Sequence, residues 1–112
     1  MMKQLFITLQ REIVQKLVQG LDPDKIILFG SYAYGTPKED SDLDLMIILP
    51  HSSEPPYRRA QKAYRCVGAV GFPKDLLVLT HDEFEKQSRV TTSLARQVKE
   101  MGKVLYERRK AG

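Results

Sequence analysis

The sequence predicts an α/β protein of the α+β kind, with a small mixed sheet of three to four strands covered by helices. Three observations support this fold class. Short apolar runs rich in β-branched residues alternate with longer stretches in which apolar residues recur every three or four positions. Clusters of Gly, Pro and Asp separate these segments. A chain of 112 residues, 42% hydrophobic and 29% charged, suits one core, so we expect residues 1–112 to form a single domain.

The first fifty residues predict one long helix, two strands and a short helical turn. Residues 3–20 carry apolar residues at every fourth position with Lys and Glu between them, as in an amphipathic helix. Residues 25–29 are a short apolar run, which favours a buried strand. Residues 32–34 follow a Gly-Ser pair and suit a short helix. Residues 42–49 are apolar on both faces after two opening aspartates, which is typical of a central strand.

A third helix and a third strand follow a connection bounded by prolines. Residues 57–70 suit a helix, and residues 75–79 suit a strand that begins with Asp75. The residues expected on the inward face of this helix are Ala60, Tyr64, Val67 and Val70.

The last thirty residues predict two helices and an edge strand. Thr80 and Glu83 fit a capping box, which predicts a helix over 81–87. A further helix is expected over 93–101, and Gly102 ends it before an edge strand at 103–106. The residues expected on the inward face of the helix at 93–101 are Leu94, Val98 and Met101.

The composition excludes several classes of protein. No apolar run approaches the ~20 residues that cross a bilayer, and the first residues lack a signal-peptide core, so we expect a cytoplasmic protein without membrane contact. Cys66 is the only cysteine, which excludes an internal disulfide and a cysteine zinc site. We interpret it as a small apolar residue on a helix. His51 and His81 are interpreted as surface or capping residues.

The charge is unevenly distributed along the chain. Residues 1–50 contain five Lys and Arg against seven Asp and Glu, whereas residues 51–112 contain thirteen against seven. The basic half suggests affinity for phosphates of a nucleotide or nucleic acid, or for an acidic partner. Arg58, Lys62 and Arg65 share one helical face, with Arg59 beside them. This face is either solvated or a contact for phosphate or a partner, and both interpretations stay open.

Two carboxylates open the strand at 42–49. In a strand, Asp42 and Asp44 project to the same side about 6–7 Å apart, and two such carboxylates repel unless a cation lies between them. Oxygen ligands of this kind suit Mg²⁺ or Mn²⁺. The alternative is that both residues only solvate the start of the strand. An unpaired buried carboxylate is costly, which supports a metal site, but from these two residues alone both interpretations stay open.

A Gly-Ser pair ends the strand at 25–29. Gly30 lets a phosphate approach the backbone, and the hydroxyl of Ser31 can add a hydrogen bond or cap the short helix. Tyr32 and Tyr34 lie close by, where a ring either flanks a nucleobase or packs the short helix; we favour packing. Asp75 opens its own strand as Asp44 does. If these two strands are neighbours, three carboxylates converge at one edge of the sheet, as a two-metal site requires.

Taken together, Gly30-Ser31, Asp42-x-Asp44 ten residues further on and Asp75 on a later strand resemble the signature of the minimal nucleotidyltransferases. These belong to the DNA polymerase β-like superfamily. The resemblance extends from Lys25 to Tyr106 and implies a nucleotidyltransferase-like fold. It also implies transfer of a nucleoside monophosphate, usually AMP from ATP, to a hydroxyl group with release of pyrophosphate.

The resemblance also implies roles and partners. Gly30 and Ser31 would hold the triphosphate, Asp42 and Asp44 would bind two Mg²⁺ ions, and Asp75 would help bind one ion and accept the hydroxyl proton. Family members often act beside a helical HEPN partner protein, and some are antitoxins of toxin–antitoxin systems that AMPylate a tyrosine of that partner.

Two other functions stay open. One is the catalytic subunit of a template-free polymerase, although no residues remain after the core for a domain that grips nucleic acid. The other is a nucleotide-binding subunit that masks a partner without catalysis, although masking does not require three carboxylates. The sequence leaves the acceptor, the base of the nucleotide, the identity of the partner and a homo-oligomeric state undetermined.

Overall fold

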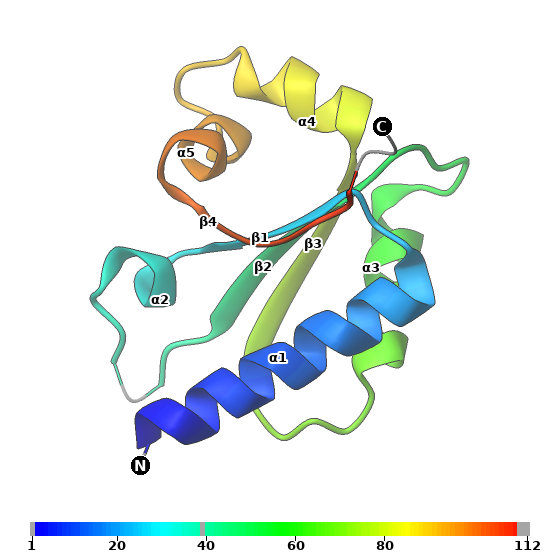
Figure 1. Cartoon of the computed structure of the whole chain (residues 1–112). Helices are drawn as coiled ribbons and strands as arrows, with labels where there is room; N and C mark the ends of the chain where they lie inside the picture. The colour runs from blue at the N-terminus through cyan, green and yellow to red at the C-terminus, as the bar shows by residue number, and fades with distance from the viewer. Residues whose placement is uncertain (1, 39, 110–112) are drawn as a thin grey trace.

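A computed structural model of the chain contains a four-stranded mixed sheet with helices on both faces, which confirms the predicted fold class (Figure 1). It describes residues 2–38 and 40–109, with side chains from Phe6 onward. The strands lie in the order β3-β2-β1-β4, with β1 antiparallel to β2 and β4, and β2 parallel to β3. Their bounds are β1 Lys25–Phe29, β2 Leu43–Leu49, β3 Lys74–Thr80 and β4 Lys103–Glu107.

The helices form two layers around this sheet. Helices α1 and α3 cover one face, α4 and α5 cover the other, and the short α2 lies at the end of β1 (Figure 1). Their bounds are α1 Met2–Leu21, α2 Ser31–Tyr34, α3 Pro56–Val67, α4 His81–Ser88 and α5 Leu94–Met101. None of the helices within the described ranges is both long enough and apolar enough to span a bilayer.

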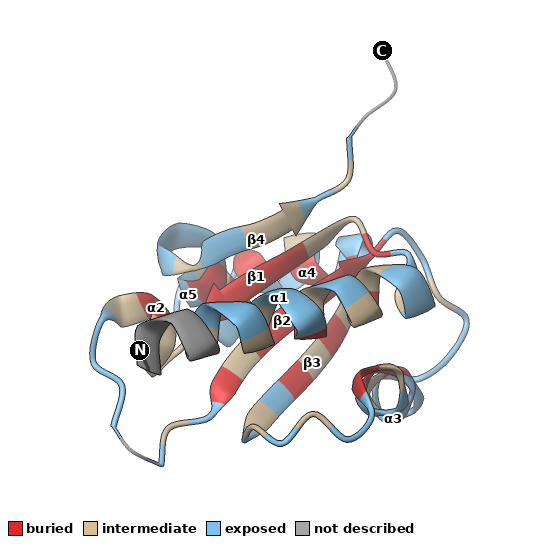
Figure 2. Cartoon of the chain, turned by 60° about the horizontal axis from the view of Figure 1, so that its bottom comes forward, coloured by how far each residue is buried: buried red, intermediate tan, exposed pale blue. Residues whose placement is uncertain are grey.

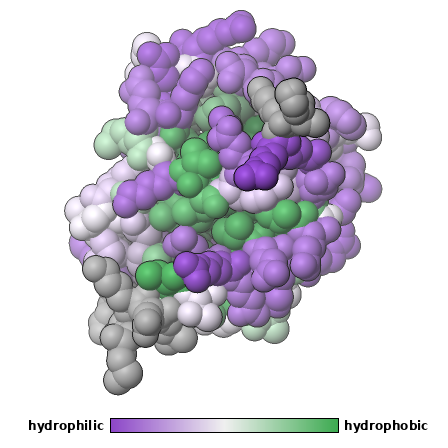
Figure 3. Space-filling model, in the orientation of Figure 1, coloured by the Kyte–Doolittle hydropathy of each residue, from purple (hydrophilic) through white to green (hydrophobic). Residues whose placement is uncertain are grey.

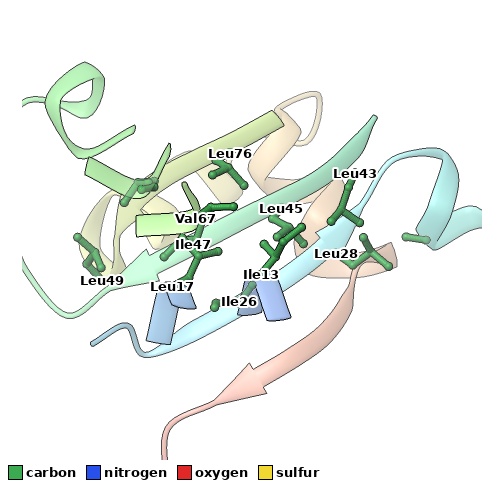
Figure 4. Packing of buried hydrophobic residues seen from close by; sticks show 13 residues of the cluster. Ile13, Leu17, Ile26, Leu28, Leu43, Leu45, Ile47, Leu49, Val67 and Leu76 are labelled. Atoms are coloured by element: carbon green, nitrogen blue, oxygen red, sulfur yellow. The ribbon is translucent and has the colours of Figure 1, made fainter. Parts of the chain in front are cut away.

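The core follows from the predicted patterns. Ile13 and Leu17 of α1 are fully buried against the sheet, as their four-residue spacing predicts. Leu45 and Ile47 of the central strand β2 lie between them and α3 (Figure 4). Alternate residues of β2, such as Met46, point to the opposite face and pack against α4 and α5. Figure 2 accordingly shows β2 as largely buried.

The predicted cap of α4 is confirmed. The Thr80 hydroxyl accepts a hydrogen bond from the Glu83 backbone N–H at 3.2 Å, and the Glu83 carboxylate accepts one from the Thr80 N–H at 2.8 Å. The prediction that Leu94 and Met101 of α5 face inward is wrong, because Leu94 is 44% exposed and Met101 is 56% exposed. The buried residues of α5 are Ala95 and Val98.

The inward face of α3 also differs from the prediction. Its buried residues are Arg59, Ala63 and Val67, whereas Tyr64 is exposed at 39% and Val70 follows the end of the helix. The grouping of Arg59 with the basic face is therefore wrong. Its guanidinium donates to both carboxylate oxygens of Glu83, at 2.6 and 3.0 Å, and to the Val78 carbonyl at 3.1 Å. This contact joins α3, β3 and α4.

Apolar side chains also reach the surface. On the face shown in Figure 3, hydrophobic residues gather over β4 between α1 and α5. On β4, Val104 is 52% exposed, and a groove beside this strand is lined by Val14, Val18 and Leu105. Cys66 packs against the core as predicted, with its Sγ in the space where a side chain at Gly20 would lie.

Candidate active site

Three separate segments of the chain meet at one end of the sheet. Phe29, the last residue of β1, is the antiparallel partner of Asp44, and Asp44 is the parallel partner of Asp75. Because neighbouring strands lie about 4.8 Å apart, Gly30, Asp44 and Asp75 lie side by side at this end. The predicted neighbourhood of the second and third strands is confirmed.

Asp44 is the most constrained carboxylate of this group. Its burial raises the pKa of its carboxyl group above the ordinary value, and the negative charges of Asp75 and Asp42 raise it further. A side chain at Gly30 would overlap with Asp44 Oδ2, so the bare glycine leaves room for this carboxylate. A bound cation would relieve the repulsion that the three aspartates impose on one another.

Asp42 lies just outside the strand in which it was predicted. Strand β2 begins at Leu43, whose backbone N–H donates to the Pro73 carbonyl at 2.8 Å. Asp42 is therefore an exposed residue of the preceding loop, although its charge still acts on Asp44. Polar residues followed by a buried apolar run mark such a boundary only to within a residue or two.

Asp75 is held by a residue that sequence reasoning did not assign to the site. The Tyr64 hydroxyl accepts from the Leu76 backbone N–H at 3.0 Å, and its single proton is shared between Asp75 Oδ1 at 3.4 Å and the Lys74 carbonyl at 3.5 Å. The neighbouring Lys74 forms no ion pair with Asp75 and donates to the carbonyls of Val70 and Phe72 at 2.8 and 3.1 Å. No sequence pattern links Tyr64 to a carboxylate eleven residues further on.

The Gly-Ser turn connects β1 to α2. Gly30 has a φ of 74° and a ψ of −160°, a conformation that only glycine adopts without strain. Its carbonyl accepts hydrogen bonds from the N–H groups of Ala33 and Tyr34, which begins α2. The Ser31 hydroxyl has no hydrogen-bond partner among the residues that the structure describes, so it is available to a ligand.

The aromatic residues of α2 pack as favoured by the sequence. Tyr32 stacks on Phe6 with ring centroids 4.6 Å apart, and Phe72 tilts against both rings. This cluster fixes α2 to α1 and to the turn before β3. The ring of Tyr32 is therefore used in packing.

A divalent cation fits the chemistry of this edge. Asp42, Asp44 and Asp75 offer carboxylate oxygens, the donors that Mg²⁺ prefers, and their mutual repulsion favours a positive charge between them. Within residues 2–38 and 40–109, no group of three or more His, Cys, Asp or Glu side chains could hold a metal ion by itself. Since Mg²⁺ commonly combines one or two carboxylates with substrate phosphates, the nucleotide would complete the ligand set.

The remaining predicted candidates lie outside this edge. Arg58, Lys62 and Arg65 are exposed on α3 and form no ion pair with another described residue. His51 and His81 are exposed, as interpreted from the sequence, and His81 is the first residue of α4.

Comparison with known proteins identifies the family of the chain. A family model described as a nucleotidyltransferase domain matches residues 7–107. A crystal structure of a Sulfolobus solfataricus protein assigned to the nucleotidyltransferases has a TM-score of 0.67 at 21% identity, over 93% of this chain and 82% of that one. A mutant of the toxin-antitoxin MntA-HpeT has a TM-score of 0.49 at 22% identity, over 86% and 72%. No curated protein matches the sequence.

Proposed function

Because the chain belongs to the nucleotidyltransferase domain family and is an enzyme of that class, we propose that it transfers AMP from ATP to a hydroxyl group of a protein or small-molecule acceptor. The observation that supports this proposal is the pairing of Asp44 with Asp75 beside Gly30 at one end of the sheet. Acidic residues on adjacent strands next to a glycine turn suit a reaction between a triphosphate and a hydroxyl.

Each residue of this edge has a proposed role. Gly30 and Ser31 bind the triphosphate, the first by leaving the backbone accessible and the second through its free hydroxyl. Asp42, Asp44 and Asp75, together with oxygens of the triphosphate, would hold two Mg²⁺ ions. The chemistry that Mg²⁺ supplies when bound is neutralisation of the charge that develops on the phosphoryl oxygens.

The transfer itself is a substitution at phosphorus. The acceptor oxygen forms a bond to the α-phosphorus, the bond between that phosphorus and the oxygen bridging to the β-phosphate breaks, and pyrophosphate leaves. A carboxylate oxygen of Asp75 accepts the hydroxyl proton. Tyr64 holds this carboxylate in place through its hydrogen bond to Asp75 Oδ1.

As the acceptor we propose a helical partner protein of the HEPN type, as the resemblance to minimal nucleotidyltransferases implies. In that case the chain would be the antitoxin of a toxin–antitoxin pair and would AMPylate a tyrosine. Incubation of the chain with ATP, Mg²⁺ and a helical protein encoded by an adjacent gene should add the mass of AMP to that protein. Intact-mass spectrometry measures the addition.

Variants of the aspartates make this experiment specific. Asp44→Asn and Asp75→Asn should lower the rate of AMP addition at least a hundredfold. Asp82→Asn is the matched control, because Asp82 is an exposed carboxylate in α4, beyond the opposite end of β3. Addition at the wild-type rate in both site variants would overturn the assigned roles. Binding of ATP without any transfer would favour the masking function.

A further inference from the structure

An apolar groove begins at Leu77, two residues after the proposed catalytic Asp75 on β3. Asp75, Leu77 and Leu79 alternate along β3 and so lie on one face of the sheet, about 7 Å apart in succession. On β2, Met46 follows Asp44 in the same way. The groove that these leucines and Met46 line has a volume of about 300 Å³.

The other walls of the groove come from the helices on either side of β3. Tyr57 and Ala60 of α3 form one wall, and Gln87 and Leu94 of α4 and α5 form the other. The lining contains no Lys, Arg, Asp or Glu. Leu94 is 44% exposed and Tyr57 62% exposed, so the groove is open along its rim.

The direction of the reaction decides which substrate reaches this groove. In a substitution at phosphorus, the attacking oxygen and the leaving group lie on opposite sides of the phosphorus. Gly30 and Ser31, the proposed triphosphate site, follow β1 on one side of Asp44, whereas Asp75 and the groove lie on the other side, at β3. With the triphosphate at Gly30 and Ser31, pyrophosphate would leave on the β1 side and the acceptor would approach from the β3 side.

We propose that this groove binds the acceptor, and that the acceptor is a protein segment with apolar side chains next to the hydroxyl that receives AMP. The inference rests on the function proposed above and specifies its substrate. An apolar lining favours apolar side chains, because burying Leu77, Leu79 and Leu94 removes hydrocarbon surface from water. An open rim accommodates a chain segment, whereas small-molecule sites enclose most of their ligand.

The same lining disfavours a nucleic-acid acceptor. Binding of a nucleic-acid strand depends on Lys and Arg that neutralise its phosphates, and the groove offers none. The basic residues of α3, Arg58, Lys62 and Arg65, are not among the residues that line it. The lining of the groove thus favours a protein acceptor over the 3′-hydroxyl of a nucleic-acid strand.

Synthetic acceptors test the proposal directly. Two tyrosine-containing decapeptides, one with Leu and Phe around the tyrosine and one with Ser in their place, are incubated with the whole chain, ATP and Mg²⁺, alongside an oligothymidylate with a free 3′-hydroxyl. We expect AMP addition to the apolar peptide at least tenfold faster than to the serine peptide or the oligonucleotide. Equal rates for the two peptides, no peptide modification, or preference for the oligonucleotide would overturn the proposal.

A pair of variants in one helix assigns the preference to the groove. Leu94→Glu should raise the KM for the apolar peptide at least tenfold. Met101→Glu is the control, because Met101 is another exposed apolar residue of α5 that lies outside the groove. Both residues are exposed, so both variants should fold, which circular dichroism checks. An unchanged KM in Leu94→Glu would contradict the assignment.

The binding of a non-hydrolysable ATP analogue distinguishes failure of the proposed function from failure of the groove assignment. Leu94→Glu should bind the analogue as the wild type does, since the groove lies away from Gly30 and Ser31. Failure of the wild type to bind the analogue would count against the proposed function itself. Binding without any peptide preference would count against the groove alone.

Discussion

The carboxylate of Asp44 occupies the space in which a side chain at Gly30 would lie. The turn after β1 and the acidic residue of β2 are therefore fitted to each other, and neither can change without affecting the other. Burial and the negative charges of Asp75 and Asp42 also raise the pKa of the Asp44 carboxyl group. A glycine at position 30 thus serves two purposes: it permits a φ of 74° and it accommodates the carboxylate.

Replacing this glycine should lower the activity by displacing Asp44, and a second glycine separates this effect from that of backbone strain. Gly30→Ala should cost about 2 kcal/mol of unfolding free energy through backbone strain and lower kcat/KM at least tenfold by displacing Asp44. Gly35→Ala imposes a positive φ of 81° as well, but nothing lies within 4 Å of its added carbon. It should cost about 1 kcal/mol and keep its activity. Urea denaturation and AMP-transfer assays measure both, and equal activity losses would contradict the role of the overlap.

The contact between Arg59 and Glu83 should make the free energy of unfolding depend on pH in the acidic range. Hydrogen bonds from the Arg59 guanidinium are the largest cause that lowers the pKa of Glu83, to about 2. Since the unfolded carboxyl group titrates near 4.5, the contact stabilises the fold fully above pH 4.5. This contribution should decline as the pH falls from 4.5 to about 2, because the unfolded chain takes up the proton first.

Glu83→Ala measures this contribution. It should lower the unfolding free energy at pH 7 by about 2 kcal/mol, because it leaves the buried Arg59 without its counter-charge and removes the capping bond from the Thr80 N–H. The difference from the wild type should shrink between pH 4.5 and pH 2. Glu12→Gln removes the exposed Glu12–Lys16 pair and should change the stability by less than about 0.5 kcal/mol. A difference that stays constant across this pH range would contradict the assignment.

Local sequence patterns predict the strands of this protein better than its side-chain contacts. The bounds of β1, Lys25–Phe29, are those expected, because a Pro-containing turn before the apolar run and a Gly-Ser pair after it mark both ends of the strand. The proximity of Asp44 and Asp75 could be stated only conditionally, because it depends on which strands pair. The sequence pattern of β2 and β3 carries no information on that choice.

The errors concern residues whose burial is decided by distant partners. An arginine on a helix is usually solvated, and Arg59 is buried because Glu83, twenty-four residues later, supplies two oxygens. On α5, eight residues are too few to define an apolar face by periodicity. The small residue Ala95 packs on the sheet, while the larger Leu94 and Met101 remain exposed.

The hydroxyl of Tyr64 should contribute to catalysis more than to folding. Tyr64→Phe removes the hydrogen bonds to Asp75 Oδ1 and from the Leu76 N–H, so we expect kcat to fall about tenfold and the unfolding free energy to fall by about 1 kcal/mol. The KM for ATP should not change, because Tyr64 lies on the β3 side of the site. Tyr106→Phe is the control, since Tyr106 lies on β4, outside the groove, and no described residue hydrogen-bonds to its hydroxyl. A fall in stability with unchanged kcat would show a purely structural role.

A cation and a nucleotide bound at the acidic edge should stabilise the fold together. At a hundred times its dissociation constant, a ligand adds about 2.7 kcal/mol. For a domain of this size that corresponds to a rise of about 10 °C in Tm. We expect this rise with Mg²⁺ and a non-hydrolysable ATP analogue, and a much smaller one with the analogue and EDTA, because the carboxylates and the phosphates then repel.

Asp44→Asn should lose most of the rise that depends on Mg²⁺, whereas Asp82→Asn should retain it. Thermal unfolding followed by circular dichroism measures these shifts, and an equal Mg²⁺-dependent rise in Asp44→Asn would place the cation elsewhere.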